Sequence, residues 1–117
     1  MTFHKYLGDS KMFEYDKHYR ECQQLNKPFI KAKIDPRHGN YFVQIDLMTC
    51  DYDFSEKEID TIQKLVDAES LFLKSKSNSI MHGYHIDKEI AWFDGISTEN
   101  VHEFCEKLYD ITQENHP

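Results

Sequence analysis

Apolar and aromatic positions recur at the three- and four-residue spacing of an amphipathic helix in three parts of the chain. The first part begins at Asp9 or Ser10, either of which could cap a helix, and runs to Leu25. Pro28 follows, and proline pushes the residue before it away from the α region. The pattern therefore predicts a helix that ends before Pro28.

The second helical part begins at Ser55, which with Glu58 three positions later matches a capping box. Its C-terminal end is open, because residues 71–73 could continue the helix or start a short strand, and the polar residues 75–79 form a loop in either case. For the third part, residues 97–98 offer a cap and the helical period continues to near Glu114.

Between the first two helices, two runs alternate with the period of a strand. After Pro28, Ile30 and the apolar positions in step with it share one face, while Phe29, Lys31 and Lys33 share the other. The Pro- and Gly-containing residues 35–40 predict a turn, and a second strand then continues to near Cys50. These runs predict a hairpin.

Residues 80–86 and 89–93 are rich in β-favouring side chains and predict a second hairpin around Asp87 and Lys88. We expect the dipeptide 94–95, Asp-Gly, to end the fourth strand. Trp92 and its neighbour Phe93 must point to opposite faces of this strand, and the sequence does not say which is buried.

The order helix, hairpin, helix, hairpin, helix predicts an α+β two-layer sandwich, in which helices cover one face of a four-stranded antiparallel sheet. A length of 117 residues fits a single domain spanning residues 1–117, and hydrophobic and aromatic contents of 39% and 14% are enough for one core. The sequence contains no apolar run near the roughly 20 residues that cross a bilayer. Residues 1–8 lack the pattern of a secretory signal, so we expect a cytoplasmic protein without membrane association.

The chain carries a formal net charge of −7, and the charge is unevenly distributed. Residues 1–40 hold 8 Lys and Arg against 5 Asp and Glu, whereas residues 41–117 hold 6 against 16. Clustered cations are needed to neutralise phosphates, so we expect no direct nucleic-acid binding by the second part and favour a positively charged partner. The 7 histidines would add a pH dependence near about pH 6.5.

Carboxylates line the side opposite the apolar stripe on both the second and the third predicted helices. Those on the second are Glu56, Asp60 and Asp67, and those on the third are Glu99, Glu103, Glu106 and Asp110. Acidic helix faces are often simply solvated, but like charges at this spacing destabilise an isolated helix slightly. The interpretation that they meet a basic partner predicts these residues as its binding surface, with Trp92 as a candidate aromatic anchor.

A second hypothesis is a small enzyme or ligand-binding domain that uses His82 and His85 with Asp51 and Asp53. On a strand, however, side chains three positions apart point to opposite faces, so His82 and His85 should diverge rather than chelate. The Asp51-to-Ser55 segment resembles the start of a calcium loop but lacks the later glycine and bidentate carboxylate. We therefore expect no metal and no cofactor, and we identify no catalytic residue.

The three cysteines fit neither a disulfide framework nor a metal clip. Cys22 and Cys105 fall on apolar helix stripes and are expected in the core, while Asp51 beside Cys50 should raise the pKa of that thiol. A third hypothesis is a sheet that binds single-stranded RNA through Phe29, Lys31 and Lys33, with Lys27 and Arg37 nearby.

The preferred hypothesis is a small acidic, non-enzymatic inhibitor that covers a basic protein, such as a nuclease or another nucleic-acid-binding protein. Immunity proteins against nuclease toxins and phage-encoded inhibitors of nucleic-acid-processing defence systems act in this way as classes. Only size and charge support this analogy.

Overall fold

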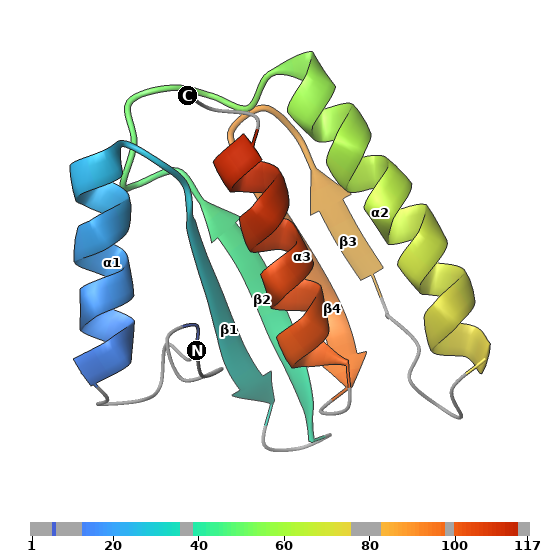
Figure 1. Cartoon of the computed structure of the whole chain (residues 1–117). Coiled ribbons are helices and arrows are strands. Elements are labelled where there is room, and N and C mark those ends of the chain that lie inside the picture. The colour runs from blue at the N-terminus through green and yellow to red at the C-terminus, as the bar shows by residue number, and fades with distance from the viewer. Residues whose placement is uncertain (1–5, 7–12, 36–38, 76–82, 98–99, 115–117) are drawn as a thin grey trace.

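The computed structural model describes residue 6 and residues 13–35, 39–75, 83–97 and 100–114. Figure 1 shows the order of the elements along the chain. The helices are α1 (Phe13–Leu25), α2 (Glu56–Ser75) and α3 (Val101–Glu114), and the strands are β1 (Phe29–Asp35), β2 (Asn40–Asp46), β3 (Gly83–Ile86) and β4 (Ile90–Ser97). The predicted order of helices and hairpins is therefore confirmed.

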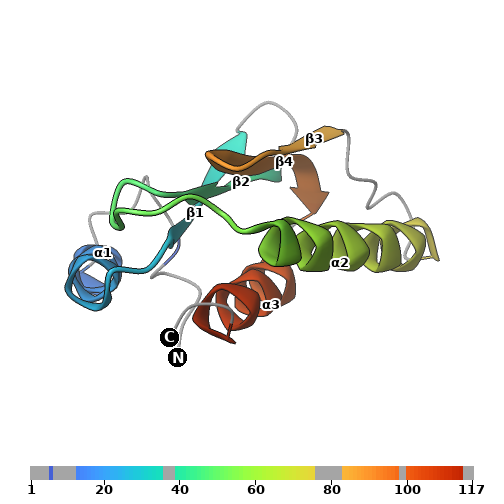
Figure 2. The ribbon, with the colours of Figure 1, turned by 90° about the horizontal axis from the view of Figure 1, so that it is seen from above.

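The four strands form one antiparallel sheet in the order β1-β2-β4-β3, so each predicted hairpin is present and the two hairpins meet at β2 and β4. All three helices lie on the same side of this sheet (Figure 2). α3 packs on β1 and β2, α2 packs on β3 and beside α3, and α1 packs on the edge strand β1. The predicted α+β two-layer sandwich is confirmed, with one face of the sheet covered by helices.

The core lies between the sheet and the helices and is filled by the apolar side of each element. Phe93 of β4 and Phe104 of α3 meet edge to face with ring centroids 5.0 Å apart, and both are almost completely buried. Cys105 is also buried in this core, and Cys22 is buried on α1, as predicted for both. None of the three cysteines is disulfide-bonded.

The capping box at the start of α2 has the predicted geometry. The Ser55 hydroxyl accepts a hydrogen bond from the backbone N–H of Glu58 at 3.1 Å, and the Glu58 carboxylate accepts one from the N–H of Ser55 at 3.0 Å. These bonds satisfy amides that the first turn of a helix leaves unpaired. From the sequence, residues 71–73 could continue the helix or start a strand. In the structure they belong to α2, which ends at Ser75.

Two predicted boundaries are wrong because side chains make local turns. β2 ends at Asp46 rather than near Cys50, since the Asp46 carboxylate accepts a hydrogen bond from the N–H of Met48 at 2.8 Å and turns the chain. Before α3, the residue next to the helix is Asn100, which donates from its amide to the Ser97 hydroxyl at 2.7 Å. Ser97 is therefore the end of β4 and not the helix cap, and Thr98 lies outside the described residues.

The expected strand break at Asp94 and Gly95 is also wrong, because β4 continues through both to Ser97. The register of β2 against β4 shifts between Tyr41 and Val43, where β4 holds one extra residue. Gly95 has a φ of 81°, the left-handed conformation that a bulge of this kind places on glycine. The Asp-Gly pair bends the strand without ending it.

Phe29 does not share an exposed face with Lys31 and Lys33. It is only 2% exposed and packs between His18 and Tyr19 of α1, at ring-centroid distances of 4.9 and 5.1 Å. Strand alternation alone predicts the opposite, because it ignores a helix packed beside the first residue of an edge strand. Phe29 is therefore not available to a binding surface on the sheet.

Candidate functional site

One face of the sheet is left uncovered by all three helices (Figure 2). The strand register places alternate side chains of every strand on this face, because their neighbours in sequence are buried in the core. From β1 to β3 these residues are Lys31, Lys33, Phe42, Gln44, Asp46, Ile90, Trp92, Asp94, Gly83 and His85. Most are partly or fully exposed, so they form a surface that a partner could reach.

A row of three rings crosses this face at Trp92. The Trp92 ring lies 5.8 Å from that of Phe42 on β2 and 6.2 Å from that of His85 on β3, and the ring planes differ by 25° and 23°. In the strand register, Trp92 is paired with Gln44 of β2 on one side and with His85 of β3 on the other. Three rings held by three paired strands form a pre-ordered row on this surface.

Charge on this face is divided between its edge and its centre. On β1, the Lys31 ammonium lies 3.7 Å from the Asp46 carboxylate of β2, while Lys33 occupies the register position opposite Phe42 and is exposed. At the other end, the His85 imidazole contacts the Asp87 carboxylate at 2.6 Å. The cations therefore lie at the β1 edge, and carboxylates lie nearer the ring row.

The Asp87 carboxylate organises the turn between β3 and β4. One oxygen contacts His85, and the other accepts hydrogen bonds from the backbone N–H groups of Glu89 at 2.7 Å and Ile90 at 2.9 Å. The hydrogen bond with His85, followed by these two amides, lowers the Asp87 pKa to about 2. Asp87 is thus a fixed negative charge at physiological pH.

We expect the Asp87 carboxyl to titrate near pH 2 in the folded protein, and we expect His85→Ala to raise its pKa because the His85 hydrogen bond is the main cause of the shift. A carboxyl whose pKa is lowered by folding contributes stability that is present above its unfolded pKa, about 3.9, and is lost as the pH falls through about 2. NMR titration of the side-chain carboxyl carbon measures both midpoints.

The matched control for this titration is His102→Ala on α3, where the imidazole contacts Glu106 instead. It should leave the Asp87 midpoint unchanged. An Asp87 midpoint that does not move in His85→Ala would contradict the assignment of the shift to that contact.

The predicted helix carboxylates lie outside the core, and on α2 they border strand β3, because Asp67 accepts a hydrogen bond at 3.0 Å from Gln63, whose amide also donates to the Tyr84 hydroxyl at 3.1 Å. Glu56, Asp60, Asp67, Glu103 and Asp110 are exposed, and Glu106 is half-buried. Glu99 lies outside the described residues. α2 and α3 pack beside each other, so these residues are carried by neighbouring helices (Figure 1).

Cations of the same helices partly balance this charge. Asp60 lies 4.0 Å from Lys64, and Glu103 lies 3.4 Å from Lys107. Glu106 contacts the His102 imidazole at 3.3 Å. Within residues 56–68 and 102–113 the six predicted carboxylates are interleaved with Lys57, Lys64 and Lys107, so the accessible parts of these helices are acidic but not uniformly so.

Trp92 lies on the uncovered face of the sheet, whereas these carboxylates lie on helices that cover the other face (Figure 2). Its neighbours Ala91 and Phe93 are fully buried beneath the helices, so the Trp92 ring extends from the uncovered face. The structure does not bring together the two parts of the predicted binding surface.

The residues of the predicted enzyme or ligand site are also separate. His85 contacts Asp87, and Asp51 accepts a hydrogen bond from the Asn26 amide at 2.8 Å; no contact joins His85 to Asp51 or Asp53 in the described part of the chain. His82 and Arg37 lie outside the described residues. Within the described ranges, no group of three or more His, Cys, Asp or Glu residues could hold a metal ion.

The Cys50 thiol has a raised pKa, as predicted, although burial contributes more than the neighbouring Asp51. A raised pKa lowers the thiolate fraction, which is the opposite of what a nucleophile requires. The surroundings of Cys50 therefore do not activate its thiol as a nucleophile.

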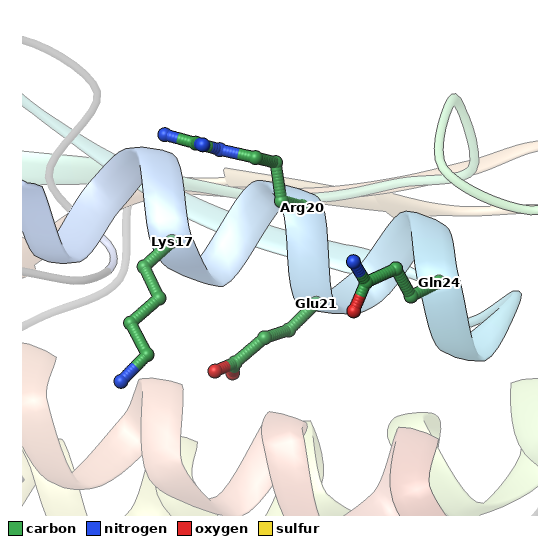
Figure 3. A pocket seen from close by; sticks show the side chains of 4 residues that line it. All are labelled: Lys17, Arg20, Glu21 and Gln24. Atoms are coloured by element: carbon green, nitrogen blue, oxygen red, sulfur yellow. The ribbon is translucent and has the colours of Figure 1, made fainter.

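A shallow hollow of about 270 Å³ runs along α1 and is lined by Lys17, Arg20, Glu21 and Gln24 (Figure 3). Lys17 and Glu21 extend in one direction and Arg20 in another. All four residues come from one exposed helix side, and none belongs to the candidate sites predicted from the sequence. The hollow offers two cations and one carboxylate but no nucleophile.

No protein-family model matched the chain, and no curated protein or solved structure matched it either. None of the helices in the described ranges is long and apolar enough to cross a bilayer. The residues themselves therefore carry the functional argument.

Sequence reasoning missed the ring row and the role of Phe42. The alternation of side chains along β2 is enough to put Phe42, Gln44 and Asp46 on one face, and they share the uncovered face. The missing information was that β2 pairs with β4, because only this pairing brings Phe42 beside Trp92. Strand pairing between two separate hairpins has no signal in a single sequence.

Proposed function

We propose that this chain is a small, non-enzymatic binding protein that covers a positively charged surface of a protein partner and so inhibits it. The observation that supports this is the solvent-accessible part of the neighbouring helices α2 and α3, where six carboxylates are interleaved with three lysines. Carboxylates in this position can pair with the Lys and Arg side chains that a nucleic-acid-processing partner uses to hold phosphate. The bound protein would then block its partner's substrate site.

The net charge of −7 supports the same proposal, because complementary charge accelerates association with a basic partner and disfavours other partners. By analogy of size and charge, we place the chain with immunity proteins against nucleases or with phage-encoded inhibitors of defence systems. Under this proposal it acts in the cytoplasm, where such partners process nucleic acid.

Reversing charge on the helix layer tests the proposal. The partner is first recovered by affinity capture from the native host, and its association rate with the purified chain is then measured at 50 and 300 mM salt. We expect the wild-type rate to fall as salt rises, because screening weakens attraction between exposed charges. The double variant Asp67→Lys/Asp110→Lys should associate roughly threefold to tenfold more slowly, with a weaker salt dependence.

The matched control is Asp16→Lys/Asp53→Lys, which makes the same change in net charge at exposed positions on α1 and in the loop before α2. It should slow association by less than about twofold. An acidic partner, or an equal loss of rate in the control variant, would show that the helix layer is not the binding surface.

A further inference from the structure

The buried side of α1 is built around a histidine. Among residues 16–25, the part of this helix whose side chains the structure describes, only His18 and Cys22 are buried, each 3% exposed. Leu25, at the end of the helix, is 57% exposed. The attachment of this part of α1 therefore depends on a side chain that can take up a proton near neutral pH.

Aromatic rings from three other parts of the chain surround His18. Its ring lies 4.9 Å from that of Phe29 on β1, 5.4 Å from that of Tyr6 and 5.9 Å from that of Tyr109 on α3, measured between centroids. Within α1, the Cys22 sulfur lies 3.7 Å from the His18 Nδ1 atom. Rings and a thiol replace water poorly around an ionised group, so these surroundings favour the neutral imidazole.

The two tyrosines beside His18 carry no charge near neutral pH. Burial is the main cause that raises the pKa of Tyr6 and of Tyr109, so both hydroxyls keep their protons wherever a histidine titrates. Just before β1, the Lys27 ammonium donates a hydrogen bond to the backbone carbonyl of Gln113 at the end of α3, at 3.0 Å. None of these three side chains supplies a negative charge to an imidazolium at His18.

Carboxylates lie at the rim of the same cluster. Glu21 of α1 and Glu106 and Asp110 of α3 act on it electrostatically, and their charge favours an imidazolium. Glu21 and Asp110 are exposed, however, and Glu106 contacts the His102 imidazole at 3.3 Å. Solvent and salt screen exposed charges, whereas the loss of water acts directly on a buried ring, so we expect burial to outweigh the rim carboxylates.

We propose that protonation of His18 releases α1 from β1 and α3, so that this helix is a pH-sensitive element of the fold. α1 lies beside the edge strand β1 (Figure 1), and its release would uncover Phe29, which packs between His18 and Tyr19. In the released helix water again surrounds the imidazole, so the released form binds a proton more readily than the docked form. Docking is therefore most stable above the ordinary histidine pKa of about 6.5 and weakens as the pH falls below it.

This device goes beyond the proposed function. It concerns the attachment of α1, whereas the proposed binding surface belongs to α2 and α3. The association rates of the charge-reversal variants are measured at one fixed pH, so either idea can fail without the other.

Hydrogen–deuterium exchange followed by mass spectrometry tests the release helix by helix, at pH 7.5 and 5.5, with correction for the intrinsic exchange rate. We expect protection in α1 to fall by up to about tenfold at pH 5.5. One pH unit below the ordinary histidine pKa, about nine in ten released helices hold the extra proton. Because α1 opens separately, its peptides should exchange before those of α2 and α3 at both pH values.

Two variants assign the effect to His18. His18→Leu and His18→Gln both carry a neutral side chain at every pH, so the fall in α1 protection between pH 7.5 and 5.5 should shrink to less than about twofold in each. If the leucine variant does not fold by circular dichroism, the glutamine variant gives the same test. The matched control is His102→Gln, an exposed histidine on α3, which should keep the full wild-type change.

Three results would overturn the proposal. A wild-type α1 whose protection does not fall at pH 5.5 would show that the docked site accepts the imidazolium. A fall that persists in the His18 variants would assign the effect to another group. Exchange of all three helices together would mean that α1 is not released on its own. In each case the charge-reversal variants of α2 and α3 still test the proposed function separately.

Discussion

Phe93→Ala is expected to lower the free energy of unfolding by about 3–5 kcal/mol, the usual cost of removing a large aromatic ring from a core. Phe93 is 0% exposed, and its ring packs edge to face on Phe104 at 5.0 Å. Truncation leaves a cavity between the sheet and α3 that rigid neighbours fill only in part. Urea unfolding followed by far-ultraviolet circular dichroism measures the change.

The matched control for Phe93→Ala is Phe42→Ala, which removes the same ring from the uncovered face, where it is partly exposed. Its cost should be only roughly 1 kcal/mol. If Phe93→Ala does not fold, the pair Phe93→Leu and Phe42→Leu preserves the comparison, and Phe93→Leu should remain the more costly. Equal costs at the two positions would contradict the assignment of the faces.

Gly95→Ala should destabilise the protein by about 1–2 kcal/mol, because the φ of 81° at this position places a side chain in the left-handed region. Gly95→Asn should cost less, since asparagine tolerates this conformation better than alanine. Chemical denaturation again measures the free energy of unfolding. A neutral Gly95→Ala would mean that β4 does not need the bulge.

Gly83→Ala is the control for the bulge, on the neighbouring strand β3. A Cβ at this position would meet nothing within 4 Å, and Gly83 is not among the glycines with positive φ. Its effect should stay within roughly 0.5 kcal/mol. A similar loss in both variants would attribute the effect to glycine replacement in general.

Local patterns predicted the elements of this fold well. The helical spacing located α1, α2 and α3, and alternation with turn residues located both hairpins, because amphipathic periods and turn chemistry act within a few residues of the chain. The capping box at Ser55 and Glu58 is the clearest case, since its two hydrogen bonds join residues three positions apart. Boundaries were less accurate, as the ends of β2 and β4 show.

The errors arose where a distant element changed the environment of a residue. Phe29 was expected to be exposed because it alternates with Ile30, but α1 covers it with His18 and Tyr19. Gly95 was expected to end a strand, but pairing with β2 carries β4 past it. In both cases the local sequence pattern was real, but a contact with a distant element decided the structure at that residue.

Of the two candidate surfaces, one could be predicted from local sequence patterns and the other required tertiary contacts. Helical periodicity was enough to place Glu56, Asp60, Asp67, Glu103 and Asp110 on the solvent side, since a helix with one apolar stripe turns its other side outward. The ring row needed the pairing of β2 with β4 and of β4 with β3, which joins Phe42, Trp92 and His85 from three strands.

By itself, the amino-acid sequence determined the helices, the hairpins, the fold class and the acidic side of the helix layer. These properties depend on interactions between residues that are close along the chain. Only the tertiary structure decided that Phe93 is buried and Trp92 is not, and that Trp92 lies on the sheet face that the helices leave uncovered (Figure 2). The physical reason is that side chains alternate between the two faces of a strand, and only the packing of other elements decides which face is buried.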